Sequence, residues 1–267
     1  MDRISKALEQ AKQGVAKTRP HKARTEEIVS VEPINYTKTK KVALSSDLLR
    51  ENRIFIGTEN TQIVDTYGLL RTRVVKAMRK NNWKTIGVTS PDPSVGKTVT
   101  AINLAISIAL DHNYSTLLVD TDLRRPGISK SLGLECKCGL SDYLTDDKSM
   151  EDLLLNPEIE HLVIAPTNRV ESGSSELLSS PRMRRFVEEA KERYPERLVI
   201  FDLPPVLVGD DVVALSQHLD TLLIVVEDGK TQSKDLNRAT ELLKDVNILG
   251  VVLNKGTAVS DQYEYYK

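Results

Sequence analysis

Cysteine is scarce in this chain of 267 residues, and its scarcity excludes several classes of protein. The two cysteines, Cys136 and Cys138, are separated by one residue, and no second pair exists. They can build neither a disulfide framework nor a complete zinc site. Because unpaired thiols suit a reducing compartment, we expect a cytoplasmic protein.

Long apolar runs are also lacking. No segment has the ~20 consecutive apolar residues that a membrane helix needs. The N-terminal stretch MDRISKALEQAKQG has no apolar core of the kind found in signal peptides. We therefore expect no direct membrane insertion, and recruitment to the inner face of a membrane would have to run through a partner.

Neither sign of charge is in large excess. The formal net charge is -1 and the sequence pI is about 6.5. Nucleic-acid-binding domains are usually strongly basic, so we expect no nucleic acid partner.

The first fifty residues differ from the rest, with eleven Lys and Arg against six Asp and Glu. Ile4, Leu8 and Ala11 fall on one face of a short amphipathic helix, and a solvated basic linker follows. Two interpretations of this segment stay open: it is a docking segment, or it is a tail without a role. We divide the chain into this region at 1–50, a domain at 51–256 and a flexible, tyrosine-rich tail at 257–267.

Short β-rich segments alternate with longer helical ones throughout the domain. The expected strands are 85–90, 115–122, 161–166, 197–205, 221–228 and 248–255, and the expected crossover helices are 98–112, 179–194 and 233–246. Strands that are apolar on both faces and separated by helices indicate a parallel, doubly wound α/β sheet. Ligands of such sheets bind at the carboxyl ends of the strands.

The stretch TSPDPSVGKT, residues 89–98, lies between the first of these strands and a helix. Gly96, Lys97 and Thr98 match the end of a phosphate-binding loop, in which backbone N–H groups, a lysine and a hydroxyl meet phosphate and Mg²⁺. The first glycine of the G-x-x-x-x-G-K-[ST] pattern is replaced by Pro91. A bare Gly-Lys-Thr is therefore weak evidence by itself.

Carboxylates follow two of the strands at the expected binding edge. LLVDTD ends in Asp120 and Asp122, and LVIFD ends in Asp202 after four apolar residues. One such aspartate is commonly a helix cap or a turn residue. Three of them beside a Gly-Lys-Thr instead predict a site for ATP and Mg²⁺ in a P-loop NTPase fold.

From about residue 60 onward the sequence resembles the bacterial tyrosine kinases of capsule and exopolysaccharide systems, relatives of MinD/ParA-type P-loop ATPases. The matching segments are DTYGLLRTR, SPDPSVGKT, LLVDTDLRRP, GLSDYLTDD, SELLSSPRMRRF, VIFDLPPVLVGDD and GVVLNK. The proline-serine loop occurs within that family, and the Asp-x-Asp pair corresponds to its second Walker A motif. SKALEQAK is similar to the subgroup in which the kinase is a separate cytoplasmic chain.

The resemblance implies individual roles at the site. Nucleotide contacts would come from Ser94, Val95, Gly96, Lys97, Thr98, Val99 and Asn254. The Mg²⁺ ligands would be Thr98 and Asp122, with Asp202 in support. Lys97, Asp120 and Asp122 would be catalytic, with Asp120 accepting the tyrosine hydroxyl proton. The chemistry requires mainly in-line positioning and neutralisation of phosphate charge.

The C-terminal YEYYK supplies candidate phosphate acceptors. Tyr263, Tyr265 and Tyr266 are three of the eight tyrosines of the chain, and they follow a polar stretch without strand or helix pattern. The family phosphorylates such a cluster on a neighbouring subunit. The resemblance therefore implies autophosphorylation that regulates exopolysaccharide or capsule polymerisation and export.

The resemblance also implies partners. These are a membrane-spanning polysaccharide co-polymerase, or chain-length protein, as activator, a cognate phosphotyrosine phosphatase and further copies of the chain in a homo-oligomer. The ring-forming Glu-x-x-Arg-x-x-Arg pattern of the family is here Asp65, Gly68 and Arg71. This departure indicates weaker ring formation or a need for the partner.

Two other functions remain open from the sequence. A MinD/ParA-like ATPase switch shares the loop and Asp202, but it leaves the Asp-x-Asp pair and the tyrosines unexplained, and no lysine lies at 91–95. The second open function is that of a non-catalytic scaffold whose nucleotide site is degenerate. Phosphotyrosine formation separates the kinase from the switch, and ATP binding separates both from the scaffold.

Overall fold

The computed structural model describes residues 39–57, 61–111, 113–194 and 196–256. Within them, one eight-stranded sheet has the order β1-β4-β5-β3-β6-β2-β7-β8. All neighbouring strands are parallel except the antiparallel β4 and β5. The strands are β1 Lys40–Lys41, β2 Thr85–Ser90, β3 Ser115–Asp120, β4 Leu155–Asn156, β5 Leu162–Ala165, β6 Arg197–Pro205, β7 Thr221–Glu227 and β8 Ile248–Asn254.

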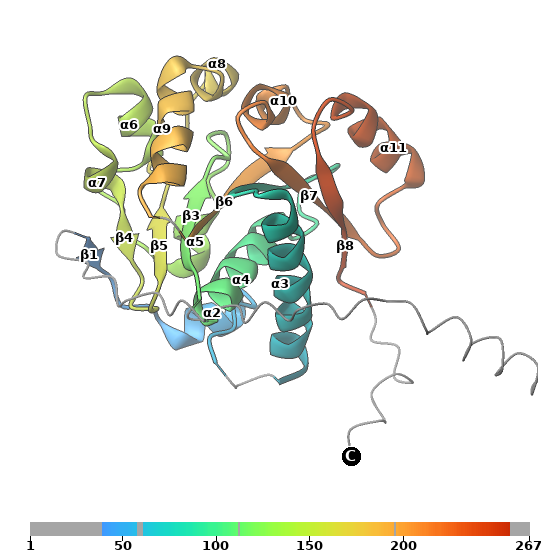
Figure 1. The fold of residues 1–267 in the computed structure, drawn as a ribbon, viewed down its shortest axis with the longest axis horizontal. Helices are drawn as coiled ribbons and strands as arrows, with labels where there is room; N and C mark the ends of the chain where they lie inside the picture. The colour runs from blue at the N-terminus through green and yellow to red at the C-terminus, as the bar shows by residue number, and fades with distance from the viewer. Residues whose placement is uncertain (1–38, 58–60, 112, 195, 257–267) are drawn as a thin grey trace, which may run out of the picture.

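Helices cover both faces of the sheet (Figure 1). On one face lie α2 Ser46–Glu51, α3 Thr61–Asn81, α4 Lys97–Ala109 and α5 Ile128–Leu132. On the other lie α6 Leu140–Thr145, α7 Met150–Leu153, α8 Ser174–Leu178, α9 Pro181–Glu192, α10 Asp211–Ser216 and α11 Ser233–Leu242. The predicted doubly wound α/β fold is confirmed.

The alternation of side chains along each strand builds two cores from one sheet. In β3, Leu117 and Val119 join the core beneath α6 to α11, whereas Leu118 joins the core beneath α2 to α5. β2, β3 and β6 are buried along their whole length. These central strands fix the edge of the sheet at which the phosphate-binding loop lies.

The six strands and three long helices expected from the sequence are present, with ends that differ by up to four residues. The two-residue strands β1 and β4 were not predicted, because two residues carry no periodic pattern. The expected boundary at residue 50 falls inside α2, whose Leu49 is buried in the core. β1, at Lys40–Lys41, also pairs with β4, so the sheet includes residues upstream of that boundary. Among the described residues, no helix has both the length and the apolarity needed to cross a membrane.

Asp220, just before β7, connects the amino ends of β7 and β2 to the carboxyl end of α9. Its Oδ2 accepts hydrogen bonds from the backbone N–H groups of Lys84 and Thr85, both at 2.8 Å, and its Oδ1 lies 2.8 Å from Lys191 Nζ. Partial burial raises the pKa of Asp220, but the Lys191 ammonium and these N–H groups outweigh burial, and the net pKa is below its ordinary value.

We predict that Asp220→Ala lowers the free energy of unfolding at pH 7 by about 2 kcal/mol, because buried donors lose their acceptor. A depressed folded pKa stabilises the protein above the unfolded pKa of about 3.9, and this contribution is lost as pH falls through the folded pKa. Urea unfolding at pH 7 and pH 3.5 should therefore show a smaller deficit at the lower pH. Asp147→Ala, at a fully exposed carboxylate, serves as control. An equal deficit at both pH values would contradict the electrostatic account.

Candidate functional site

The phosphate-binding loop connects the end of β2 to the start of α4. Gly96 has φ 94°, and a Cβ there would lie 2.1 Å from Asn254 Nδ2, so only glycine fits. Val206 donates its N–H to the Ser90 carbonyl at 2.8 Å, which ties the base of the loop to the end of β6. The first turn of α4 presents its free N–H groups at this point, a favourable place for an anion.

The three predicted carboxylates lie together at the same edge of the sheet. Asp120 and Asp202 are register partners on neighbouring strands, and Asp122 follows β3 by two residues. All three are buried, with exposures of 0%, 0% and 4%. Asp202 lies three residues before the end of β6 rather than at its end. The spatial cluster predicted from the strand ends is nonetheless present.

Lys97 places its ammonium among these carboxylates. Its Nζ is 3.0 Å from Asp122 Oδ2, 3.6 Å from Asp202 Oδ1 and 3.4 Å from Thr98 Oγ1. Burial lowers the pKa of Lys97, but the negative charges of Asp202 and Asp122 outweigh burial and raise it above its ordinary value. The lysine therefore stays charged, and it is the positive charge nearest the phosphate site.

Asp202 is a buried carboxylate with unused hydrogen-bonding capacity. Neither of its oxygens has a hydrogen-bond partner among the described residues, and burial raises its pKa even though Lys97 opposes this effect. Such orphaned acceptors need a cation or water. Together with the Thr98 hydroxyl and Asp122 they fit Mg²⁺, which usually takes one or two protein oxygens and completes its shell from water and phosphate.

Asp120 holds the turn that follows β3. Its Oδ2 accepts the N–H groups of Gly127 and Ile128 at 3.0 and 2.9 Å, whereas its Oδ1 has only a long contact, 3.3 Å, with the Asp122 N–H. Burial, together with the charge of Asp202, raises the pKa of Asp120 to about 8. Oδ1 is therefore the oxygen with capacity to accept a proton.

The remaining predicted nucleotide residues lie on or beside the loop. Ser94 is exposed and has φ 63°, and Val95 is buried. Val99 is on the first turn of α4, where its carbonyl accepts from Asn103 Nδ2. Asn254, at the end of β8, donates from Nδ2 to the Val95 carbonyl at 2.8 Å. Its amide N–H therefore contacts the loop backbone.

Sequence reasoning missed one side chain next to the site. Lys255 Nζ donates to the Ser94 carbonyl at 2.8 Å and is paired with Glu227 at 3.0 Å. The GVVLNK segment contains Lys255, and its Asn254 was expected at the nucleotide, but nothing in the sequence singles out Lys255 as a contact of the loop.

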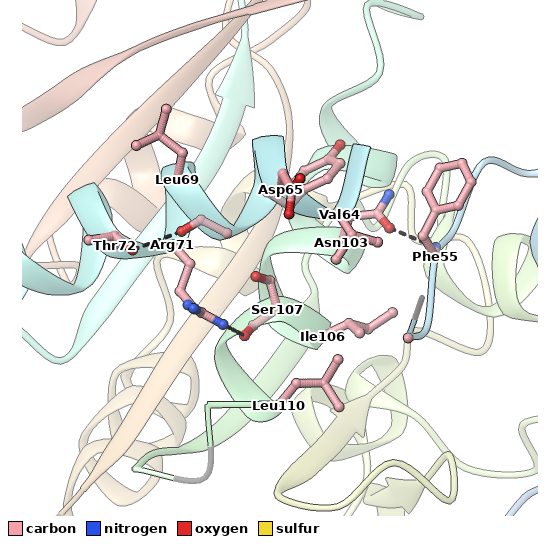
Figure 2. A pocket seen from close by; sticks show the side chains of 13 residues that line it. Phe55, Val64, Asp65, Leu69, Arg71, Thr72, Asn103, Ile106, Ser107 and Leu110 are labelled. Atoms are coloured by element: carbon pink, nitrogen blue, oxygen red, sulfur yellow. Dashed lines mark hydrogen bonds between the residues drawn. The ribbon is translucent and has the colours of Figure 1, made fainter. Parts of the chain in front are cut away.

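A separate groove of about 530 Å³ lies between α3 and α4 (Figure 2). Asp65, Gly68 and Arg71, the three residues at the positions expected to form subunit contacts, all line it. Arg71 donates to the Ser107 carbonyl at 3.0 Å, so this arginine is engaged within the chain. The groove contains no residue predicted for nucleotide binding, and it is distinct from the phosphate site.

Some predictions fall outside the described residues. These are the amphipathic helix around Ile4, Leu8 and Ala11 and the tyrosines Tyr263, Tyr265 and Tyr266.

The chain is similar to known proteins over most of its length. A family model described as an AAA domain matches residues 83–255. Tyrosine-protein kinase YwqD of Bacillus subtilis is 32% identical over 76% of this chain and 85% of its own length. Tyrosine-protein kinase CpsD of Streptococcus pneumoniae serotype 4 is 33% identical over 64% of this chain and 76% of its own length.

Solved structures extend the comparison. The kinase domain of the Escherichia coli tyrosine kinase ETK aligns with a TM-score of 0.69 and 26% identity, covering 85% of this chain and 94% of that one. The septum site-determining protein MinD of Pyrococcus horikoshii aligns with a TM-score of 0.53 and 22% identity over 64% of this chain and 69% of that one, a likeness of fold alone. The chain therefore belongs to the AAA-domain family of P-loop proteins and, within it, to the bacterial tyrosine-protein kinases.

Proposed function

We propose that this protein transfers the γ-phosphoryl group of ATP to tyrosine side chains of neighbouring copies of itself. The observation that carries the proposal is the placement of the Lys97 ammonium between Asp122 and Asp202 at the start of α4. A cationic lysine beside a loop of free N–H groups supports binding of a polyphosphate, and the adjacent carboxylates support binding of its metal ion.

Thr98, Asp122 and Asp202 would hold Mg²⁺, and Ser94 to Val99 together with Asn254 would contact the nucleotide. When bound, the metal supplies positive charge that neutralises the β- and γ-phosphate oxygens. Lys97 contributes a second positive charge. Lys97 now neutralises Asp122 and Asp202. With a metal ion held by these carboxylates, its ammonium would be available to the phosphate.

Asp120 is the proposed acceptor of the phenol proton. A phenol with a pKa near 10 is protonated at neutral pH, and a base of raised pKa is better matched to it than an ordinary carboxylate. With a pKa of about 8, Asp120 holds a proton much of the time near neutral pH, so only its ionised form would accept the phenol proton. The free lone pairs are on Oδ1, since Oδ2 holds the Gly127 and Ile128 amides. As Asp120 has no exposed surface, the tyrosine would reach Oδ1 only after the groups that now cover this side chain move.

The proposed acceptors are Tyr263, Tyr265 and Tyr266. Eight residues separate Lys255 from Tyr263, so the segment spans at most ~28 Å when extended. Because Lys255 contacts the loop, this reach includes the site of the same chain as well as that of an adjacent copy. We propose transfer between molecules because the bacterial tyrosine kinases that the sequence resembles phosphorylate such a cluster on a neighbouring subunit.

In the cell we place this activity in the cytoplasm at the inner face of the membrane, in the control of capsule or exopolysaccharide polymerisation and export. The partners would be a membrane-spanning co-polymerase as activator and a phosphotyrosine phosphatase. The relatives named as tyrosine-protein kinases support the kinase activity itself. Among the described residues, the α3–α4 groove, lined by Asp65, Gly68 and Arg71, would be the surface for homo-oligomer contacts.

Lys97→Met should lower autophosphorylation at least about 100-fold, because it removes the positive charge nearest the phosphates. Incubation with γ-labelled ATP followed by an anti-phosphotyrosine blot measures the loss. Lys130→Met, at an exposed position on α5, is the control and should label like wild type. Wild-type labelling of Lys97→Met would place catalysis elsewhere. ATP hydrolysis by wild type without phosphotyrosine would instead indicate an ATPase switch.

Asp122→Asn should weaken Mg-ATP binding, whereas Asp120→Asn should lower kcat about 100-fold with little change in Mg-ATP affinity. The difference arises because only Asp122 is proposed to touch the metal. Calorimetric titration of Mg-ATP and steady-state kinetics on each variant provide the two readouts. Equal losses of affinity in both variants would show that their roles are divided wrongly.

Transfer between molecules predicts a specific result in a mixing experiment. A Lys97→Met acceptor should become phosphorylated on its tail when mixed with an active donor whose tyrosines at 263, 265 and 266 are changed to phenylalanine. Mass spectrometry of the acceptor identifies the modified residue. An unmodified acceptor, together with wild-type labelling per molecule that is independent of concentration, would favour transfer within one chain.

A further inference from the structure

The phosphate-binding loop contains two residues in the left-handed backbone region. Ser94 has φ 63° and Gly96 has φ 94°. Glycine adopts such a conformation without steric cost, but serine does not. The conformation at Ser94 therefore needs support from outside the loop.

That support comes from the end of β8. Lys255 Nζ donates to the Ser94 carbonyl and Asn254 Nδ2 donates to the Val95 carbonyl, both at 2.8 Å. The C=O and the N–H of a trans peptide unit point in opposite directions. Holding the Ser94 carbonyl on the β8 side therefore turns the Val95 N–H away from β8. The Asn254 contact orients the Gly96 N–H in the same way.

Glu227, at the end of β7, fixes the lysine. Its Oε2 is 3.0 Å from Lys255 Nζ and 3.3 Å from Lys230 Nζ, and the hydrogen bond from Lys255 is the main cause that lowers the pKa of Glu227. The Asp228 N–H also donates to the Asn254 carbonyl at 2.9 Å, which joins this turn to β8. Of the two lysines on Glu227, only Lys255 contacts the loop.

We propose that Lys255 is a positioning residue for the phosphate-binding loop. Held by Glu227, it fixes the Ser94 carbonyl and so presents the Val95 N–H to the bound phosphate. Lys255 acts on the nucleotide through the loop backbone and needs no contact with the substrate. This inference rests on the proposed function, because it takes the ligand of the loop to be ATP.

Lys255→Met tests the proposal, with Lys230→Met as the matched control and Lys255→Arg as the conservative variant. The dissociation constant for Mg-ATP should rise about tenfold in Lys255→Met, the effect of losing one charge-assisted hydrogen bond. It should change less than about twofold in Lys230→Met and Lys255→Arg. Lys230 also pairs with Glu227 but does not contact the loop. Lys230→Met therefore shows the effect of losing an ion pair to Glu227 while the contact between Lys255 and Ser94 is kept.

Hydrogen exchange without nucleotide provides the second readout. Backbone amides in the peptide covering 91–97 should exchange faster in Lys255→Met than in Lys230→Met, at unchanged melting temperature. Unchanged exchange, or equal losses of affinity in both Met variants, would overturn the positioning role. If Lys255→Met exchanges faster but the wild-type protein binds no ATP, the contact between Lys255 and the loop is supported and the proposed function is rejected. Failure of the positioning role and failure of the proposed function therefore give different results.

Discussion

The site depends on the balance between one buried ammonium and three buried carboxylates. Asp120, Asp122 and Asp202 bring negative charge to an edge of the sheet that excludes water almost completely, and Lys97 is the cation that offsets it. Buried charges are costly without partners. Burial raises the pKa values of Asp120 and Asp202. Both oxygens of Asp202 also lack a hydrogen-bond partner among the described residues, which supports the proposal that this site takes a metal-bound nucleotide.

The order of the strands makes this cluster possible. β3, β6 and β2 are neighbours in the middle of the sheet, so that the two aspartate-bearing strands and the strand entering the loop end close together. Because helices cover both faces, the carboxylates remain buried while the loop and the start of α4 stay accessible at the edge. The fold thus combines a water-poor charge cluster with a phosphate-binding loop that a ligand can reach.

The outer strands contribute support that is separate from the charge cluster. Asn254, at the end of β8, and Lys255, which follows it, contact the backbone of the loop, and Glu227 of β7 pairs with Lys255. The chain then continues through Gly256 into the segment that carries the three tyrosines in sequence. The strand that supports the nucleotide site thus leads directly to the proposed phosphate acceptors, while the α3–α4 groove lies apart from both.

The sequence by itself determined the parallel sheet, because its buried strands are apolar on both faces, and it determined the loop and its aspartates, because these residues sit next to strand patterns. The tertiary structure alone decided which strands are neighbours, and hence that Lys97 contacts Asp122 and Asp202. It also decided that Asp120 holds the turn at Gly127 and Ile128, and that Lys255 supports Ser94 across 161 positions of sequence. Local patterns specify the type of each element because they reflect periodicity along the chain. Local patterns do not predict contacts between the ends of distant strands, because these contacts form only when the whole sheet packs.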